Sequence, residues 1–143
     1  MKATLDRIDE LSFVALNLWP GHSVEDIKKV IGKYIQGDET SVFMHLDDGK
    51  CVGLALVSLR HDYVEGCVTS PVGYLEGICV DQDHRKAGIA SQLCKECEDW
   101  AKGKGSTEFA SDCELTNEAS YAFHLKAGFE EANRIIHFKK KID

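Results

Sequence analysis

The sequence predicts an α/β fold formed by a single domain, residues 1–143, with the element order β-α-α-β-β-β-α-β-α-β. Some segments repeat apolar residues at helical spacing, and others are short apolar or alternating runs bounded by turn residues. No linker, internal repeat or low-complexity block divides them, and the only prolines are Pro20 and Pro71. This pattern indicates one compact unit in which strands and helices share a core.

The amino-terminal part is predicted to hold a short strand followed by two helices. Asp9 to Leu18 forms the first helix, and the turn residues Trp19-Pro20-Gly21 end it. Ser23 is a favourable N-cap for the second helix, Asp26 stands in the capping-box position, and Gly37 ends the helix. The apolar face of this helix comprises Val24, Ile27, Val30, Ile31 and Tyr34.

A β-hairpin is predicted next. Residues 40–46 and 51–59 are apolar runs on either side of Asp47-Asp48-Gly49-Lys50, a tight-turn sequence. The remaining elements follow from the same kinds of pattern: a strand over 72–80, an amphipathic helix over about 88–102, a strand over 108–112, a helix over 117–126 and a closing strand over 134–141.

Charge and composition exclude several classes of protein. The net charge is −7, from 17 Lys+Arg against 24 Asp+Glu, which argues against nucleic acid as the main partner and favours a cationic ligand. The sequence contains no apolar stretch typical of a signal peptide or a membrane span. We therefore expect a cytoplasmic protein without a membrane partner, whose six cysteines are reduced thiols.

The Cys94-x-x-Cys97 pair could indicate metal or redox chemistry, but helical spacing favours a structural role. Both cysteines fall on one apolar helix face, and no second pair of ligands is suitably spaced for zinc. The face also includes Ile89, Ala90, Leu93, Trp100 and Ala101. We expect these cysteines to lie in the core, and no metal site.

The stretch HRKAGIASQL, residues 84 to 93, predicts an anion site. It joins an apolar strand to an amphipathic helix, so unpaired N–H groups of the first helical turn face outward. Gly88 has no side chain to block a phosphate, Ala90 is small, and Arg85 and Lys86 add positive charge. A basic helix start on a solvated surface would give the same residues without binding anything.

The arrangement Arg85-x-x-Gly88-x-Ala90 between a strand and a helix resembles the pyrophosphate-binding signature of the GCN5-related N-acetyltransferases, and NEASYAFHLKAGF, residues 117–129, resembles their second motif. The resemblance implies a mixed central sheet flanked by helices, with acetyl-CoA as co-substrate. It places the pyrophosphate on the amides of residues 85 to 91 and the pantetheine along strand 72–80 and against Asn117. Asn117 is also a favourable N-cap for the helix that it begins, which would explain this residue without any ligand. The implied cofactor residues are Ile78, Cys79, Val80, Arg85, Lys86, Ala87, Gly88, Ile89, Ala90, Ser91 and Asn117.

Further segments are similar to bacterial aminoglycoside 6'-N-acetyltransferases: LWPGHS at 18–23, RHDYVEGC at 60–67, SPVGYLEGICV at 70–80 and ASD at 110–112. This similarity implies a polycationic aminoglycoside substrate, acetylated on its 6' amine, and antibiotic resistance as the consequence. It also implies a homodimer.

The chemistry of acetylation requires a base, because an alkylammonium with a pKa of about 10.4 cannot attack a thioester until it loses a proton. Glu76 interrupts an otherwise apolar strand two residues before Ile78 and is the predicted base, acting through one or two waters. The alternative is a carboxylate that only pairs with a surface cation. The N–H of Cys79 or Val80 is the expected donor to the developing oxyanion.

Direct transfer in a ternary complex is expected, since apolar neighbours should raise the pKa of the Cys79 thiol and make it a poor nucleophile. Many members of the superfamily place a tyrosine, as general acid, where this chain has His124. That histidine could protonate the departing thiolate, or it could simply pack on the last helix. Tyr121, one turn earlier, is a weaker substitute.

The acceptor site is predicted to combine aromatic faces for sugar rings with carboxylates for ammonium groups. The expected residues are Trp19, Tyr63, Glu76 and Asp112, with His22 and Asp62 as weaker candidates. Packing alone would also explain Trp19 and Tyr63. Alternative functions are acetylation of a polyamine, a small metabolite or a protein amine, and a non-enzymatic CoA-binding module.

Overall fold

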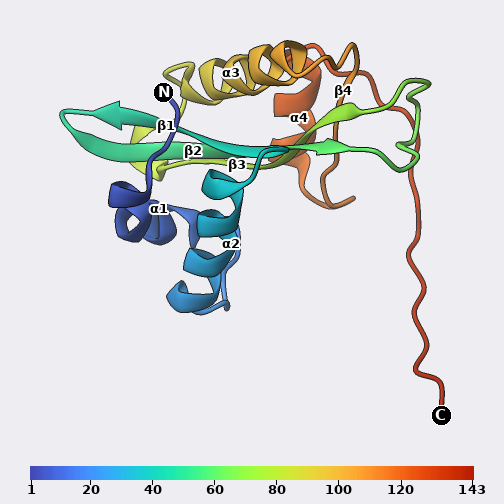
Figure 1. Ribbon diagram of the computed structural model, residues 1–143, viewed down its shortest axis with the longest axis horizontal. Coiled ribbons are helices and arrows are strands. Elements are labelled where there is room, and N and C mark those ends of the chain that lie inside the picture. Colours follow the sequence, from blue (N-terminus) through green and yellow to red (C-terminus); the bar gives the residue numbers. More distant parts are fainter. The chain divides into compact units, whose positions relative to one another are not determined.

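The computed structural model describes residues 1–143, which form two compact units, Met1–Asp112 and Cys113–Asp143. The first unit contains helices α1 to α3, strands β1 to β4 and two short 3-10 turns; the second contains one helix (Figure 1). In chain order the elements are η1 Leu5–Arg7, α1 Ile8–Ala15, α2 Val24–Gln36, β1 Thr40–Asp47, β2 Lys50–Arg60, β3 Val72–Val80, η2 Gln82–His84, α3 Ile89–Gly103, β4 Phe109–Ser111 and α4 Glu118–Lys126.

The first unit is built on a mixed sheet with the strand order β1-β2-β3-β4. β1, β2 and β3 are antiparallel neighbours, whereas β4 runs parallel to β3. Helices α1 and α2 cover one face of the sheet and α3 covers the other (Figure 1). The predicted mixed sheet flanked by helices is therefore confirmed.

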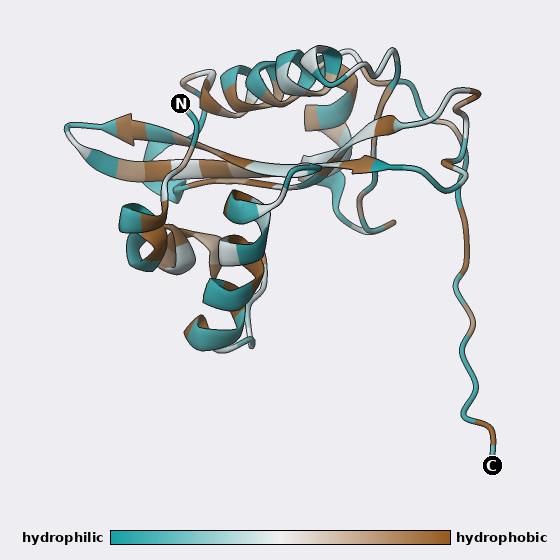
Figure 2. Ribbon diagram, viewed as in Figure 1, coloured by the Kyte–Doolittle hydropathy of each residue, from teal (hydrophilic) through white to brown (hydrophobic).

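The core lies between the sheet and the helices, because the strands are apolar on both faces. β2 is buried from Cys51 to Ser58, as a central strand covered on both sides must be. Helix α2 is amphipathic and directs Ile27 and Ile31 into this core, and Figure 2 shows hydrophilic segments alternating with hydrophobic ones along it. The side chain of Ser23 accepts a hydrogen bond from the N–H of Asp26 at 3.1 Å, which confirms the predicted N-cap.

The cysteines of α3 take the structural role that the helical spacing indicated. Cys94 and Cys97 are buried beside Leu93, and burial raises the pKa of Cys94 to about 12. All six cysteines of the chain are free. No helix is both long enough and apolar enough to cross a membrane.

Two predicted strands were wrong. The amino-terminal strand is reduced to a single bridge between Lys2 and Phe43, because the chain turns into η1 at Leu5 before a ladder can extend. Residues 134–141 form no strand, although their composition favours one. A strand needs a hydrogen-bonded neighbour, and the second unit contains none.

Gly73 lies where β3, β4 and α3 meet, and alanine there is expected to destabilise the protein. Its Cβ would lie 2.5 Å from the Cβ of Ala101 and 2.8 Å from Cδ1 of Phe109. Sheet and helix would have to separate, at a cost of about 1–3 kcal/mol in the free energy of unfolding. Urea denaturation measures this. Gly103→Ala is the control, because a Cβ at Gly103 meets nothing within 4 Å; equal stabilities of the two variants would contradict the prediction.

Candidate active site

Glu76 sits on a β-bulge, which the sequence pattern did not reveal. Leu56 pairs with Gly77 and Val57 pairs with Leu75, so Glu76 has no partner in β2. An extra residue of this kind bends a strand and redirects its side chain, and bulges are common next to active sites. Glu76, the charged residue of this apolar strand, is therefore also the residue at which the regular pairing of β3 with β2 is interrupted.

The Glu76 carboxylate is held by two residues of β2. Ser58 Oγ donates a hydrogen bond to Oε2 at 2.6 Å. Arg60 forms a bidentate hydrogen-bonded ion pair with the carboxylate: its Nε donates to Oε2 at 2.9 Å and its Nη2 donates to Oε1 at 2.6 Å. The bond to Glu76 raises the pKa of the Arg60 guanidinium and keeps it charged. The alternative interpretation of Glu76, a carboxylate that only pairs with a surface cation, therefore also has a structural basis, because Arg60 is such a cation.

Tyr74 connects this pair to Asp112. The Arg60 guanidinium carbon lies 3.4 Å from the centre of the Tyr74 ring, in a cation–π contact. The Tyr74 hydroxyl donates a hydrogen bond to the Asp112 carboxylate. Burial, together with this bond, raises the pKa of Tyr74, so the side chain remains a phenol and a donor. Two predicted acceptor-site carboxylates, Glu76 and Asp112, are thereby brought into one network.

Sequence reasoning missed the residues that join these carboxylates: Ser58, Arg60 and Tyr74. Ser58 and Arg60 are polar residues two apart near the end of the apolar strand β2, and Tyr74 stands two before Glu76. Residues two apart face the same side of a strand, so this spacing was the available signal. It does not show which two strands are neighbours or in which register they pair.

The connection between α1 and α2 carries Trp19 and His22 and lies next to the bulge. A Cβ at Gly77 would come within 3.1 Å of the Leu18 Cδ1 atom, and the Cys79 thiol lies 3.6 Å from the carbonyl oxygen of Val14. Trp19 is half-buried against the core of the first unit, whereas His22 is exposed. Packing accounts for part of the Trp19 surface, as the alternative interpretation expected.

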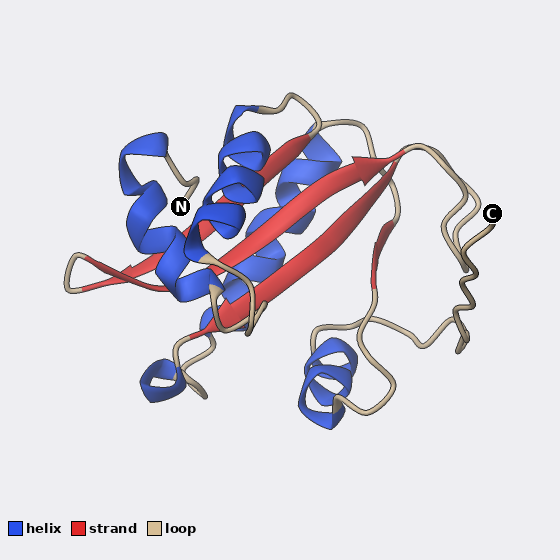
Figure 3. Cartoon of the chain, turned by 90° about the horizontal axis from the view of Figure 1, so that it is seen from below, coloured by secondary structure: helices blue, strands red, loops and turns tan.

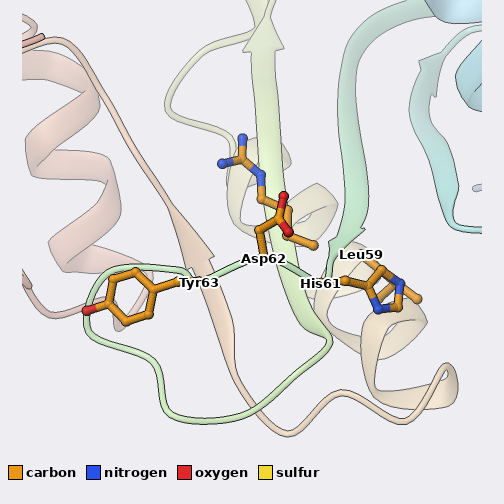
Figure 4. A pocket seen from close by; sticks show the side chains of 5 residues that line it. Leu59, His61, Asp62 and Tyr63 are labelled. Atoms are coloured by element: carbon orange, nitrogen blue, oxygen red, sulfur yellow. The ribbon is translucent and has the colours of Figure 1, made fainter.

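An open cavity of about 470 Å³ lies where β2 runs into the following loop, lined by residues 59–63. Its lining includes Arg60, so this cavity borders the Glu76 network. Tyr63 is 78 % exposed and Asp62 is also exposed, and Figure 4 shows Tyr63 pointing away from His61. An exposed tyrosine is free to contact a ligand and contributes little to packing, which disfavours the packing explanation for Tyr63.

Beyond Glu76, β3 has a free edge. β4 pairs with β3 only from Gly73 to Leu75, and Figure 3 shows the short strand diverging from the long ones. Ile78, Cys79 and Val80 therefore pair with β2 alone. Burial raises the pKa of the Cys79 thiol to about 12, as its apolar neighbours predicted.

The segment between β3 and α3 has the backbone of an anion site. Gly88 is the N-cap of α3, with φ of 79°, and Lys86 also takes a positive φ of 67°. The N–H groups of residues 86 to 91 donate to no other group of the chain, so they are available to an external acceptor. Arg85 Nε donates to the Val80 carbonyl oxygen at 3.3 Å, which fixes the start of the loop to the end of β3.

Asn117 and His124 belong to the second unit. The Asn117 side chain accepts a hydrogen bond from the N–H of Ser120 at 3.1 Å and caps α4, as its position predicted. His124 Nδ1 lies 2.7 Å from the carbonyl oxygen of Ser120, and its ring packs against Phe123 and Phe129. The packing alternative for His124 thus has a structural basis, and its catalytic role remains a prediction.

Comparison with known proteins gives a consistent result. The model of the acetyltransferase (GNAT) family matches residues 5–129. An aminoglycoside N(6')-acetyltransferase type 1 from Salmonella typhimurium is 42% identical over 125 residues, 87% of this chain and 86% of the relative. One from Acinetobacter genomosp. 13 is 39% identical over the same shares of both chains. A solved structure, AAC(6')-Iy in complex with a bisubstrate analogue, CoA-S-monomethyl-acetylneamine, superposes with a TM-score of 0.94 at 35% identity, covering 99% of this chain and 97% of that one.

Proposed function

We propose, since this chain belongs to the acetyltransferase (GNAT) family, that it transfers the acetyl group of acetyl-CoA to the 6' amine of an aminoglycoside. The observation that carries the proposal is the position of Glu76, on a bulge beside the free edge of β3 and linked through Arg60 and Tyr74 to Asp112. The names of relatives at 39% and 42% identity support the choice of acceptor. Both units then form one acetyltransferase domain, since the family match crosses the boundary at Asp112.

Acetyl-CoA is assigned to the loop before α3 and the free edge of β3. The unpaired N–H groups of residues 86 to 91 suit a pyrophosphate, and the positive end of the α3 dipole adds to its attraction. The backbone of Ile78, Cys79 and Val80 offers hydrogen bonds to the pantetheine amides, as β4 does not occupy that edge. Asn117 is a further proposed contact. The cofactor residues are those assigned from the sequence: Ile78, Cys79, Val80, Arg85, Lys86, Ala87, Gly88, Ile89, Ala90, Ser91 and Asn117.

The aminoglycoside is assigned to the surface around Glu76. Asp112 and Glu76 offer negative charge to ammonium groups, and the exposed ring of Tyr63 offers an apolar face to a sugar. Trp19 and His22 approach from the connection between α1 and α2. The net charge of −7 attracts a polycation from a distance.

The reaction proceeds in a ternary complex without an acetyl-enzyme. Glu76 removes a proton from the 6' ammonium, directly or through water, and the freed amine attacks the thioester carbonyl. A C–N bond forms, the nitrogen loses its second proton to water, the C–S bond breaks, and the thiolate of CoA leaves. The N–H of Cys79 or Val80 stabilises the oxyanion, and His124 returns a proton to the thiolate. Cys79 does not act as nucleophile, because a thiol with a pKa of about 12 is almost entirely protonated near neutral pH.

The proposed function is tested with a matched pair of acceptors. Kanamycin, which has a 6' amine, is expected to be acetylated, whereas an aminoglycoside with a 6' hydroxyl should bind through its other ammonium groups without being acetylated. Release of free CoA thiol measures turnover, and calorimetry measures binding. Equal turnover of both compounds would contradict the regiospecificity.

The same assay separates the other candidate functions. Spermidine and a peptide amine serve as alternative acceptors, and their acetylation in the absence of kanamycin turnover would move the assignment to another acceptor within the family. Binding of CoA without turnover of any amine would favour a non-enzymatic module. Measuring kcat of His124→Ala over a range of pH tests whether His124 is the general acid. A kcat that stays at the wild-type value at every pH would exclude this role.

We also propose that the enzyme is a cytoplasmic homodimer that confers aminoglycoside resistance. Large apolar side chains of the second unit are exposed, and burial against a second copy would remove them from water; they are Ile135, Ile136, Phe138 and Ile142. Light scattering after size-exclusion chromatography measures the mass in solution, and the mass of a monomer would contradict the dimer.

Resistance is tested by expressing the protein in a kanamycin-sensitive bacterium and measuring the inhibitory concentration of kanamycin. An inhibitory concentration that does not change on expression would contradict the resistance.

A further inference from the structure

We infer that Arg60 occupies, in the acceptor-free enzyme, the position on Glu76 that the acceptor ammonium takes, so that it acts as an internal competitor and sets the affinity for amines. This inference rests on the proposed function, because it assumes that an ammonium group binds Glu76. It concerns Arg60, which the sequence analysis did not single out.

Ser58 and Arg60 already use most of the hydrogen-bonding capacity of the Glu76 carboxylate. A carboxylate offers about four acceptor positions on its two oxygens. Ser58 uses one on Oε2 at 2.6 Å, and Arg60 uses one on each oxygen at 2.9 and 2.6 Å. The two-point grip of Arg60 is the geometry that arginine forms best with a carboxylate. An ammonium approaching Glu76 therefore meets a carboxylate on which three of about four acceptor positions are taken, two of them by a cation.

An acceptor ammonium bound to Glu76 would be repelled by the Arg60 guanidinium. A bound ammonium and the Arg60 guanidinium would be two positive charges sharing one carboxylate, and their mutual repulsion offsets part of the attraction of each to Glu76. Arg60 is the more exposed partner, with 43% of its side chain accessible against 20% for Glu76. The exposed guanidinium regains water when it leaves Glu76, so separating this pair costs less than separating a buried one and the incoming ammonium displaces Arg60 rather than joining it.

The surroundings of Arg60 offer the displaced side chain another place. Its guanidinium already lies 3.4 Å from the centre of the buried Tyr74 ring. The Asp112 carboxylate, at the other end of Tyr74, adds to the stabilisation of its charge. The open cavity at residues 59–63 leaves room for the side chain to move.

Two substitutions of Arg60 separate competition from simple charge repulsion. Arg60→Met removes both the positive charge and the hydrogen bonds to Glu76. Arg60→Lys keeps the charge but loses the bidentate geometry. Competition predicts a Kd for kanamycin about fivefold lower in Arg60→Met, the order of one partly exposed ion pair, and a decrease in Arg60→Lys as well. Repulsion alone predicts that Arg60→Lys keeps the wild-type Kd, and that result would overturn the inference. Calorimetry with saturating CoA measures each Kd.

The Glu76→Gln background is the matched control. Competition acts through the Glu76 carboxylate, so adding Arg60→Met to Glu76→Gln should change the Kd for kanamycin by less than twofold. A fivefold decrease there as well would overturn the inference, since the effect would not depend on Glu76. These are binding measurements, so they remain informative if kanamycin binds but is not acetylated. Wild-type enzyme that binds no kanamycin would instead refute the proposed function.

A spectroscopic readout follows the displacement directly. In the acceptor-free enzyme the Arg60 Nε–H donates to Glu76, so its proton resonance should exchange slowly with water; its loss in Arg60→Met assigns it. Saturation with kanamycin is expected to release this proton into fast exchange. A resonance that remains protected in the complex would show that Arg60 stays on Glu76, and would overturn the inference.

Discussion

Gly88→Glu is expected to weaken acetyl-CoA binding on the order of 100-fold while leaving the protein folded. The new carboxylate would stand at the first turn of α3, among the N–H groups of residues 86 to 91 that are assigned to the pyrophosphate. Two negative charges a few ångström apart at a protein surface repel by several kcal/mol at an effective dielectric constant of about 20, and the added side chain also occupies the path of the phosphate. Calorimetric titration with CoA measures the loss.

The chain offers a matched control for this substitution. Gly49, in the turn between β1 and β2, has a φ of 79°, the same as Gly88, and a Cβ at either position meets nothing within 4 Å. Gly49→Glu therefore imposes the same backbone strain, about 1–2 kcal/mol, and the same charge at a place unrelated to CoA. Similar CoA affinities in folded Gly88→Glu and Gly49→Glu would contradict the assignment of the pyrophosphate site.

Local features of the sequence predicted most of the fold because they are decided by neighbouring residues. Strand 72–80 was predicted with the bounds that it has, since Pro71 and the polar segment after Val80 delimit an apolar run. Ser23 and Asn117 were predicted as N-caps because capping involves residues three apart. The strand predicted over 134–141 was wrong, since strand formation depends on a neighbour that composition does not reveal.

The sequence singled out Glu76 and Asp112 as candidates but did not reveal the contacts that join them. Glu76 stood out as a charge within an apolar strand, but its place on a bulge depends on the register with β2. Arg60 was not singled out, because its contact with Glu76 depends on the pairing of β2 with β3 across the loop 61–71. Interactions between strands far apart in the chain are set by the whole sheet, so a pattern within one strand cannot predict them.

Glu76→Gln is expected to lower kcat/KM for kanamycin by about 100-fold or more, the range of general base catalysis. Glutamine keeps the shape of the side chain but cannot take the proton that the ammonium must lose before it attacks. The Kd for CoA should stay within about twofold, because its assigned contacts lie on the loop before α3 and on the backbone of β3 beyond the bulge. Initial rates of CoA thiol release at varied kanamycin concentrations give kcat and KM, and calorimetry measures CoA binding.

The loss in Glu76→Gln has a second possible source, which the structure makes testable. Glutamine also releases Arg60, whose freed guanidinium would then hold the bound acceptor with its 6' amine away from the thioester, which lowers kcat without changing the Kd. Arg60→Met combined with Glu76→Gln removes that guanidinium but restores no base. If the double variant stays about 100-fold below wild type in kcat/KM, the missing function is proton removal. Recovery of kcat in the double variant would instead assign Glu76 the task of holding Arg60, and would exclude it as the base.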